Sequence, residues 1–234
     1  MKLRCAWEHN GADSLLYSID YIGAYTRGEK LEAAKLKMTE EILSYLRWLE
    51  DENTYSEVEL EIVEEKNSTL NIKDADSDII FEKERKTLSI EEYLILKETA
   101  LKSALDFQVL YDSVPDKNKS LKSFRKTFYG DVPLSAKEMY VHTKNVNEYY
   151  FSEINVPADN DGNIYECRKR GFEKLETNPE FLKNSIFLGS WGEEWSLRKL
   201  LRRFVWHDRI HAKAMYRNGI KIFGPQNLSN PFCF

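Results

Sequence analysis

Two of the four histidines in the chain have a spacing that can bind a metal ion. His207 and His211 are four residues apart in a segment of helical periodicity, so their side chains lie about 40° apart on one face of the expected helix. Two imidazoles placed in this way can bind one ion, but the site still needs a ligand from elsewhere. His142 is the expected third ligand, because in an earlier helical segment it shares an apolar face with Met139 and Val146.

A site of three histidines has a definite chemical character. Three neutral imidazoles leave a divalent ion its full charge and a position for a substrate. At that position the pKa of a water is lowered, or a thiolate or an oxyanion can bind. Such a site is catalytic in type, since a fourth protein ligand would close a structural one. The alternative is that each histidine is a hydrogen-bonded core residue and that the four-residue spacing arose by chance. His9, on an expected turn, is predicted to lie at the surface.

Charged residues surround the histidine pair in the same segment. Arg203 precedes His207 by one turn and is a candidate for holding an anionic substrate group, with an ordinary ion pair as the alternative. Asp208 points about 100° away from His207, so we expect it to support the site indirectly or to lie at the surface. The opposite side of the helix carries a basic stripe that we expect to face water, formed by Arg198, Arg202, Arg209 and Lys213.

The second half of the chain is predicted to form long helices. Ser89 and Ser135 each stand three residues before a glutamate, which is the capping-box pattern of a helix start. The first of these helices ends before Pro115, and the second extends to about Ile154. Residues 164–176 and 195–222 show helical periodicity as well. Four helices of this length predict a four-helix bundle.

The first half mixes strand and helix patterns. Residues 14–22 predict a strand that pairs with the segment before Asn10, and residues 25–29 predict a turn. Helical spacing follows from residue 31 to about 50. Residues 57–63 alternate strictly, as a half-buried strand does, and residues 70–72 and 79–81 suggest further short strands. We therefore predict an α+β fold, with a small α+β domain over residues 1–86 and a helical domain over residues 87–234.

Composition limits the classes of protein that the chain can belong to. Among its 234 residues, 34 Lys+Arg against 39 Asp+Glu give a net charge of −5, which argues against wholesale coating of nucleic acid. No apolar run approaches the roughly 20 residues that span a bilayer, and the first residues lack the apolar core of a signal peptide. The 3 cysteines lie far apart and fit reduced thiols, so we expect a cytoplasmic protein.

Two helical segments resemble the DinB-like superfamily. The segment from Leu200 to Met215 is similar to the closing helix of that family, and the segment from Met139 to Tyr150 is similar to its second helix. The resemblance covers about residues 88–224 and implies a four-helix bundle with a divalent metal ion, usually zinc or nickel. On the family pattern the metal ligands are His142, His207 and His211. Relatives include thiol-dependent S-transferases and isomerases. The chain departs from the family in its bulky Arg202, Arg203 and Trp206.

The N-terminal region resembles a different family. The segment from Gly23 to Ala34 is similar to the strand, turn and helix of HicB-like domains, which form the fold of certain antitoxins. The resemblance covers about residues 1–50 and concerns packing and turn geometry. No recognisable DNA-binding segment follows it, so an antitoxin role is not implied.

These observations lead to one functional hypothesis and two alternatives. We expect a metal-dependent enzyme, a hydrolase or a thiol-dependent transferase, that acts on an unidentified small molecule without a membrane partner. The first alternative is a non-catalytic binding or regulatory protein whose HicB-like module contacts a protein or a nucleic acid. The second is a homo-oligomeric structural protein with a vestigial site, and a homodimer is compatible with each hypothesis. The basic segment 117–126 binds phosphate or RNA, or is a solvated link.

Overall fold

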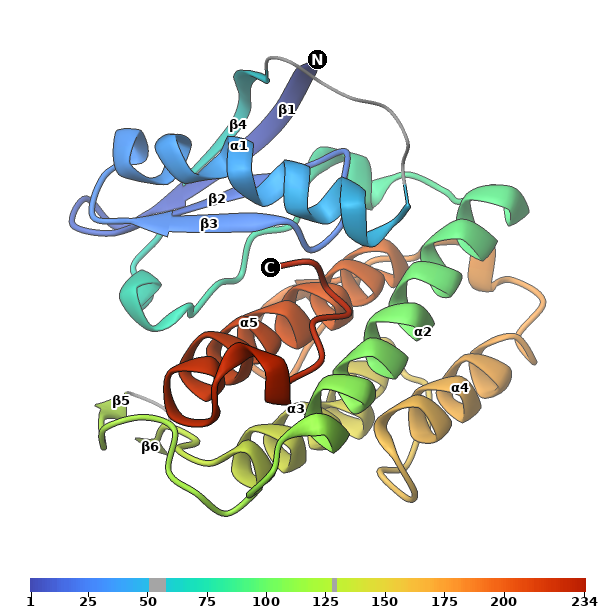
Figure 1. The fold of residues 1–234 in the computed structure, drawn as a ribbon. Coiled ribbons are helices and arrows are strands. Elements are labelled where there is room, and N and C mark those ends of the chain that lie inside the picture. Colours follow the sequence, from blue (N-terminus) through green and yellow to red (C-terminus); the bar gives the residue numbers. More distant parts are fainter. Residues whose placement is uncertain (51–57, 128–129) are drawn as a thin grey trace.

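A four-stranded sheet forms the N-terminal part of the fold. The computed structural model describes residues 1–50, 58–127 and 130–234. In the sheet, β2 lies between β3 and β1, and β4 pairs with the other edge of β1 (Figure 1). The strands are β1 (Lys2–His9), β2 (Ser14–Ser18), β3 (Tyr25–Gly28) and β4 (Glu59–Asn67). The pairs β1–β2 and β2–β3 are antiparallel, and β1–β4 is parallel.

Helix α1 (Leu31–Trp48) lies between β3 and β4 in the chain and packs along the sheet (Figure 1). Two parallel strands cannot be joined by a tight turn, so the chain must cross over between them, and α1 forms part of this crossover. Its buried Ala34, Met38 and Ile42 recur at helical spacing, and they share a hydrophobic core with Leu3 and Leu16 of the sheet. The helix predicted from residue 31 to about 50 is therefore confirmed.

The structure corrects the predictions for the other short elements of this half. Residues 25–28 form strand β3 and not a turn, because they pair with β2 and extend the sheet. Strand β4 confirms the alternating strand, although Glu57 lies outside the described residues. The strands predicted at 70–72 and 79–81 are wrong. Ile72 begins a 3₁₀ turn, and residues 79–81 have no strand partner. Their apolar side chains are buried beneath the sheet, which explains the strand-like composition.

Four helices follow and pack against one another, so the fold is α+β. They are α2 (Ile90–Ser113), α3 (Ala136–Ser152), α4 (Ile164–Leu175) and α5 (Leu197–Phe223). Helices α2 and α3 each contact both α4 and α5, as in a four-helix bundle. The short pairs β5 (Lys126–Thr127) with β6 (Gly130–Asp131), and β7 (Phe187–Leu188) with β8 (Glu194–Trp195), lie in the connections. The domain boundary near residue 86 stays a prediction.

Helix α5 is covered on both sides, which overturns the prediction of a water-facing basic stripe. Arg202 forms an ion pair with Glu84, and Arg209 and Lys213 both pair with Glu41 of α1. Arg202 and Arg209 are no more than 1% exposed, and Arg198 is also buried. The stripe is buried because the sheet, α1 and the segment after β4 pack against this side of the helix (Figure 1). Glutamates from that unit meet Arg202 and Arg209, whereas Arg198 pairs with Glu92 at the start of the following helix.

The sheet touches α5 directly at one close approach. Trp206 of α5 packs against Tyr17 and Tyr25, with ring centroids 6.1 and 5.9 Å apart. Gly23, in the turn between β2 and β3, has a positive φ, and a Cβ atom there would stand 2.6 Å from the backbone nitrogen of Trp206. Glycine is therefore needed at this position, both for its conformation and for the approach of the turn to the helix.

Two further observations concern membrane contact and the thiols. Within the ranges that the structure describes, every helix is too short or too polar to cross a bilayer. All three cysteines are free, with Cys5 and Cys167 buried and Cys233 partly exposed.

Candidate metal centre

Helix α3 brings His142 to the centre of the bundle. Its start is fixed by the predicted capping box. The Ser135 hydroxyl accepts the backbone N–H of Glu138, and the Glu138 carboxylate accepts the backbone N–H of Ser135. His142 follows the buried Met139 by three residues, so it lies on the same side of α3. That side packs against α5, and His142 remains only partly buried.

Helix α5 supplies the other two histidines. The Ser196 hydroxyl caps the helix by accepting the backbone N–H of Lys199. His207 and His211 stand one turn apart in the middle of the helix, and they are 9% and 8% exposed. A long, fully packed helix fixes their positions relative to each other, while α3 fixes the third residue.

The three histidines converge, as the sequence predicts. The Nε2 atoms of His142 and His207 are 3.2 Å apart. The ring centroid of His211 lies 4.8 Å from that of His142 and 4.6 Å from that of His207. Each residue offers one nitrogen, and these nitrogens all lie within 4.8 Å of one another. The group could therefore hold a metal ion.

The spacing of one pair of these nitrogens fits a shared ion. Zn–N bonds of 2.0–2.1 Å at a tetrahedral angle place two ligand nitrogens about 3.3 Å apart. The 3.2 Å between the Nε2 atoms of His142 and His207 agrees with this value. An N–H···N hydrogen bond between two neutral rings would have a similar length. A hydrogen bond of that kind uses only two rings, whereas an ion would also use the neighbouring His211.

Burial keeps the imidazoles neutral, which is the form that binds metal. It lowers the pKa of His207 and of His211 well below the ordinary 6.5, and the neighbouring histidines lower both values further. The pKa of His142 is also lowered, first by burial and then by the positive charge of Lys122. At neutral pH all three rings therefore have a lone pair available for an ion.

One nitrogen of each α5 histidine, the Nδ1 atom, is buried. Among the described residues, nothing forms a hydrogen bond with the buried Nδ1 atoms of His207 and His211. Metal-bound histidines usually donate their other N–H to a carboxylate or a carbonyl. In His207, whose Nε2 faces His142, no such acceptor meets the Nδ1 among the described residues, so packing fixes the orientation of this ring. The ring of Tyr150, at 6.1 Å and nearly perpendicular, packs against His207. The same observation disfavours the alternative of separately satisfied core histidines, because unpaired buried nitrogens are unfavourable.

Arg203 lies beside the cluster, and among the described residues no carboxylate is within ion-pair distance of it, although the charge of Glu193 acts on it. Its Nη1 donates to the carbonyl oxygen of Ser77 at 3.0 Å, and its guanidinium group lies 5.7 Å from the ring of Tyr150 and 4.6 Å from that of Trp206. After burial and the other two histidines, the charge of Arg203 also lowers the pKa of His207. Within the described ranges Arg203 forms no ion pair, so the ordinary alternative to anion binding is not observed.

One of the two expectations for Asp208 was a position at the surface, and that expectation is wrong. It is fully buried and accepts two hydrogen bonds from Arg168, at 2.5 and 3.0 Å, and one from the hydroxyl of Ser103 at 2.7 Å. These contacts join α4 and α2 to the turn of α5 that carries His207. Asp208 lies outside the three-histidine group and can support it only through the position of the helix.

Lys122 is a neighbour of the cluster that the sequence analysis did not single out. Its positive charge contributes to the lowered pKa of His142 and, after burial and His142, to that of His211. Burial also lowers the pKa of Lys122 itself. The signal in the sequence was the run of cations in residues 117–126, but spacing alone cannot show which of them turns toward the histidines.

His9 takes no part in the cluster. It lies on β1, where its ring stacks on that of Trp7 at 3.9 Å and its Nε2 contacts the carboxylate of Glu65 at 3.0 Å. The residue is partly buried and not simply exposed on a turn. It therefore offers a natural control for experiments on the other three histidines.

Comparisons with known proteins do not identify a family or a function for the chain. No protein-family model, no curated protein and no solved structure matches the chain. The convergence of His142, His207 and His211 is therefore the observation on which a functional interpretation depends.

Proposed function

We propose that the chain binds one divalent metal ion, zinc or nickel, through His142, His207 and His211. The observation that carries the proposal is the convergence of three neutral, largely buried imidazoles from two helices. The resemblance of the segments that form α3 and α5 to the DinB-like superfamily supports the same three ligands. Nitrogen ligands of this kind suit zinc and nickel better than magnesium or calcium, which prefer oxygen.

We further propose that the site is catalytic, in a hydrolase or a thiol-dependent transferase. A bound ion held by three side chains would act as a Lewis acid toward a substrate group at a remaining position. The protein's own residues would then bind and orient the substrate. Arg203 and Lys122 both place positive charge near the histidines, so they would favour a substrate with an anionic group. Tyr150 and the walls of the bundle would keep the rings in position.

Metal analysis tests the first part of this proposal. Protein purified without a metal-affinity column is stripped, reloaded with Zn²⁺ or Ni²⁺, and analysed by mass spectrometry of the elements. We expect one ion per chain in the wild type and in His9→Ala, and loss of the ion in His207→Ala and His211→Ala. Circular dichroism checks that the variants are folded. A wild type without stoichiometric metal after reloading, or a His207→Ala variant that retains it, would overturn the proposal.

Activity assays test the second part on the metal-loaded protein. Hydrolysis of p-nitrophenyl esters probes the hydrolase, and displacement of chloride from chlorodinitrobenzene by a small thiol probes the transferase. We expect one of the two reactions to exceed the rate of the metal-free protein and to disappear in His207→Ala. If metal binds but neither reaction is accelerated over a broad panel of such substrates, the non-catalytic alternative is favoured.

A further inference from the structure

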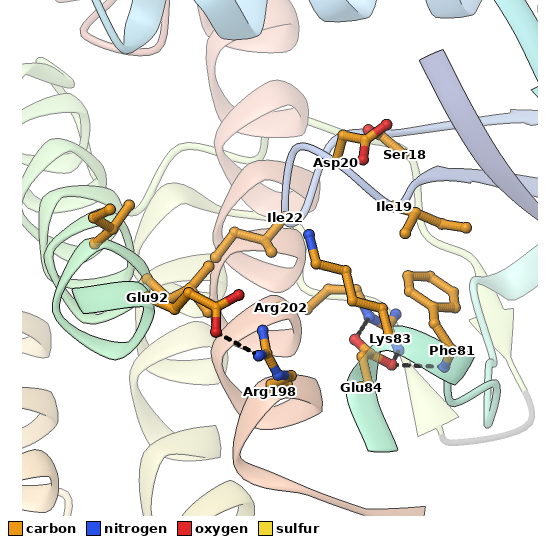
Figure 2. A pocket seen from close by; sticks show the side chains of 12 residues that line it. Ser18, Ile19, Asp20, Ile22, Phe81, Lys83, Glu84, Glu92, Arg198 and Arg202 are labelled. Carbon is orange, nitrogen blue, oxygen red and sulfur yellow. Dashed lines mark hydrogen bonds and ion pairs between the residues drawn. The ribbon is translucent and has the colours of Figure 1, made fainter. Parts of the chain in front are cut away.

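A cavity separate from the histidine cluster lies where the sheet meets the helices (Figure 2). Its volume is about 210 Å³, and its walls come from the turn after β2, the 3₁₀ turn Glu82–Arg85, the first turns of α2 and the first turns of α5. The apolar part of the wall consists of Ile19, Ile22, Phe81, Ile95 and Leu96. Both halves of the chain therefore contribute to one concave site.

The cavity lies on the other side of α5 from the metal centre. Arg202 lines it, and Arg202 precedes His207 by five residues, which is a rotation of about 140° around a helix. The backbone of α5 consequently separates the two sites. A ligand in this cavity would not touch the histidines.

Most charges in the wall are already neutralised by partners. Glu84 pairs with Arg202, and Glu92 pairs with Arg198 at 2.8 Å, as Figure 2 shows. Asp20, at the rim, accepts hydrogen bonds from the side chain and the backbone of Arg4. Three carboxylates are therefore matched by three arginines, and none of them is left to attract a cationic ligand.

One cation of the wall, Lys83, has no direct partner among the described residues. Lys83 forms no ion pair within the part of the chain that the structure describes, and its side chain extends across the cavity toward Ile22 (Figure 2). Arg202 is 1% exposed, and its Nη1 has no hydrogen-bond partner among the described residues, but this atom is closed off from solvent and so from a ligand in the cavity. The charge of Lys83 acts on the Glu92 carboxylate, whose pKa is lowered first by Arg198 and only last by Lys83. Because this ammonium group has no direct contact with a carboxylate, its N–H donors are available to an anion.

We propose that this cavity binds a small carboxylate with a branched aliphatic body. The carboxylate accepts a hydrogen bond from Lys83, and the aliphatic part lies against Ile22, Ile95 and Leu96. A volume of 210 Å³ corresponds to about seven water molecules at 30 Å³ each, so it suits a ligand of roughly eight heavy atoms. Such a molecule contacts both the ammonium group of Lys83 and the apolar wall of the cavity.

Calorimetry on the full-length protein with two matched probes tests the proposal. 4-Methylpentanoate carries the charge, and 4-methylpentanamide has the same shape without it. We expect the wild type to bind the carboxylate about tenfold more tightly than the amide, as one charge-assisted hydrogen bond predicts. Lys83→Met should remove this preference by weakening only the carboxylate. Lys86→Met is the matched control, because Lys86 is exposed on the same segment and does not line the cavity.

The position of the ligand is measured by methyl NMR on isoleucine-labelled protein. The signals of Ile22 and Ile95 should shift on addition of 4-methylpentanoate, while that of Ile164, which is buried in α4, should not. The proposal is overturned if the wild type shows no saturable binding of the carboxylate, or if the amide binds equally well. It is also overturned if Lys83→Met keeps the preference, or if Ile22 and Ile95 remain unaffected.

Discussion

The buried cluster of Glu41, Arg209 and Lys213 joins α1 to α5, and neutralising Glu41 should weaken the whole fold. Glu41 accepts a hydrogen bond from Arg209 at 3.0 Å and a second one from Lys213. Burial alone would raise the pKa of Glu41, but the two cations outweigh it and the pKa is lowered. Glu41→Gln keeps the shape of the side chain and removes the only negative charge in the cluster.

The expected loss follows from the burial of the partners. The side chains of Glu41 and Arg209 are 6% and 0% exposed, and that of Lys213 is 12% exposed. Breaking a buried pair by removing one partner costs about 3–5 kcal/mol. Burial lowers the pKa of Lys213 to about 8, so this lysine can release its proton when Glu41 is lost. We therefore expect the lower value, about 3 kcal/mol, which corresponds to a decrease in Tm of roughly 9 °C for a chain of this size.

Urea unfolding at pH 7, followed by circular dichroism, measures this loss. Glu40→Gln is the matched control, because Glu40 is the exposed neighbour on α1 and should change the free energy of unfolding by less than about 0.5 kcal/mol. The double variant Glu41→Gln/Lys213→Met should recover part of the loss, since the buried amine that Glu41 leaves without a carboxylate partner is then absent. A loss below about 1 kcal/mol in Glu41→Gln would refute the argument that this cluster holds α1 on α5.

Three other predictions concern acidity, packing and thiol reactivity. The two buried α5 histidines have a lowered native pKa, so below about pH 6.5 the unfolded chain binds more protons than the native one. The metal-free protein should therefore lose up to about 1.4 kcal/mol per pH unit for each histidine as the pH falls, measured by urea unfolding between pH 7.5 and 5.5. Replacing both histidines by alanine should flatten this dependence. Gly171→Ala should lower the free energy of unfolding by about 1–3 kcal/mol, because the new Cβ would stand 2.1 Å from the ring of Phe151. Calorimetry should show the decrease, and an unchanged Tm would contradict the packing. Burial raises the pKa of Cys5 to about 12 and also raises that of Cys167. Iodoacetamide at pH 8 should therefore label only Cys233, and mass spectrometry of the native protein would reveal any second labelled thiol.

The helices could be predicted from the sequence because their signals are local. The capping boxes at Ser89 and Ser135 mark the starts of α2 and α3, and both form as expected. The convergence of His142 with His207 and His211 could also be predicted, since each lies on the apolar face of a helix in one bundle. Apolar faces meet in a bundle, so side chains on them are brought together.

The environment of α5 could not be predicted because it depends on which unit covers the helix. Arg202 and Arg209 look like the wet side of an amphipathic helix, and only their distant partners Glu84 and Glu41 show otherwise. The strand-like composition near Ile72 was misleading for a related reason. Burial beneath the sheet favours the same residues as a strand does, without any backbone pairing.

The charged side of α5 determines how separate fragments of the protein should behave. A fragment that begins after residue 86 would lack Glu41 and Glu84, so Arg202, Arg209 and Lys213 would face solvent together on one helix. The complementary fragment would expose two glutamates and the apolar underside of its sheet. The exposed surfaces of the two fragments would be complementary in charge. We therefore expect the mixed fragments to associate, whereas each fragment alone should tend to aggregate.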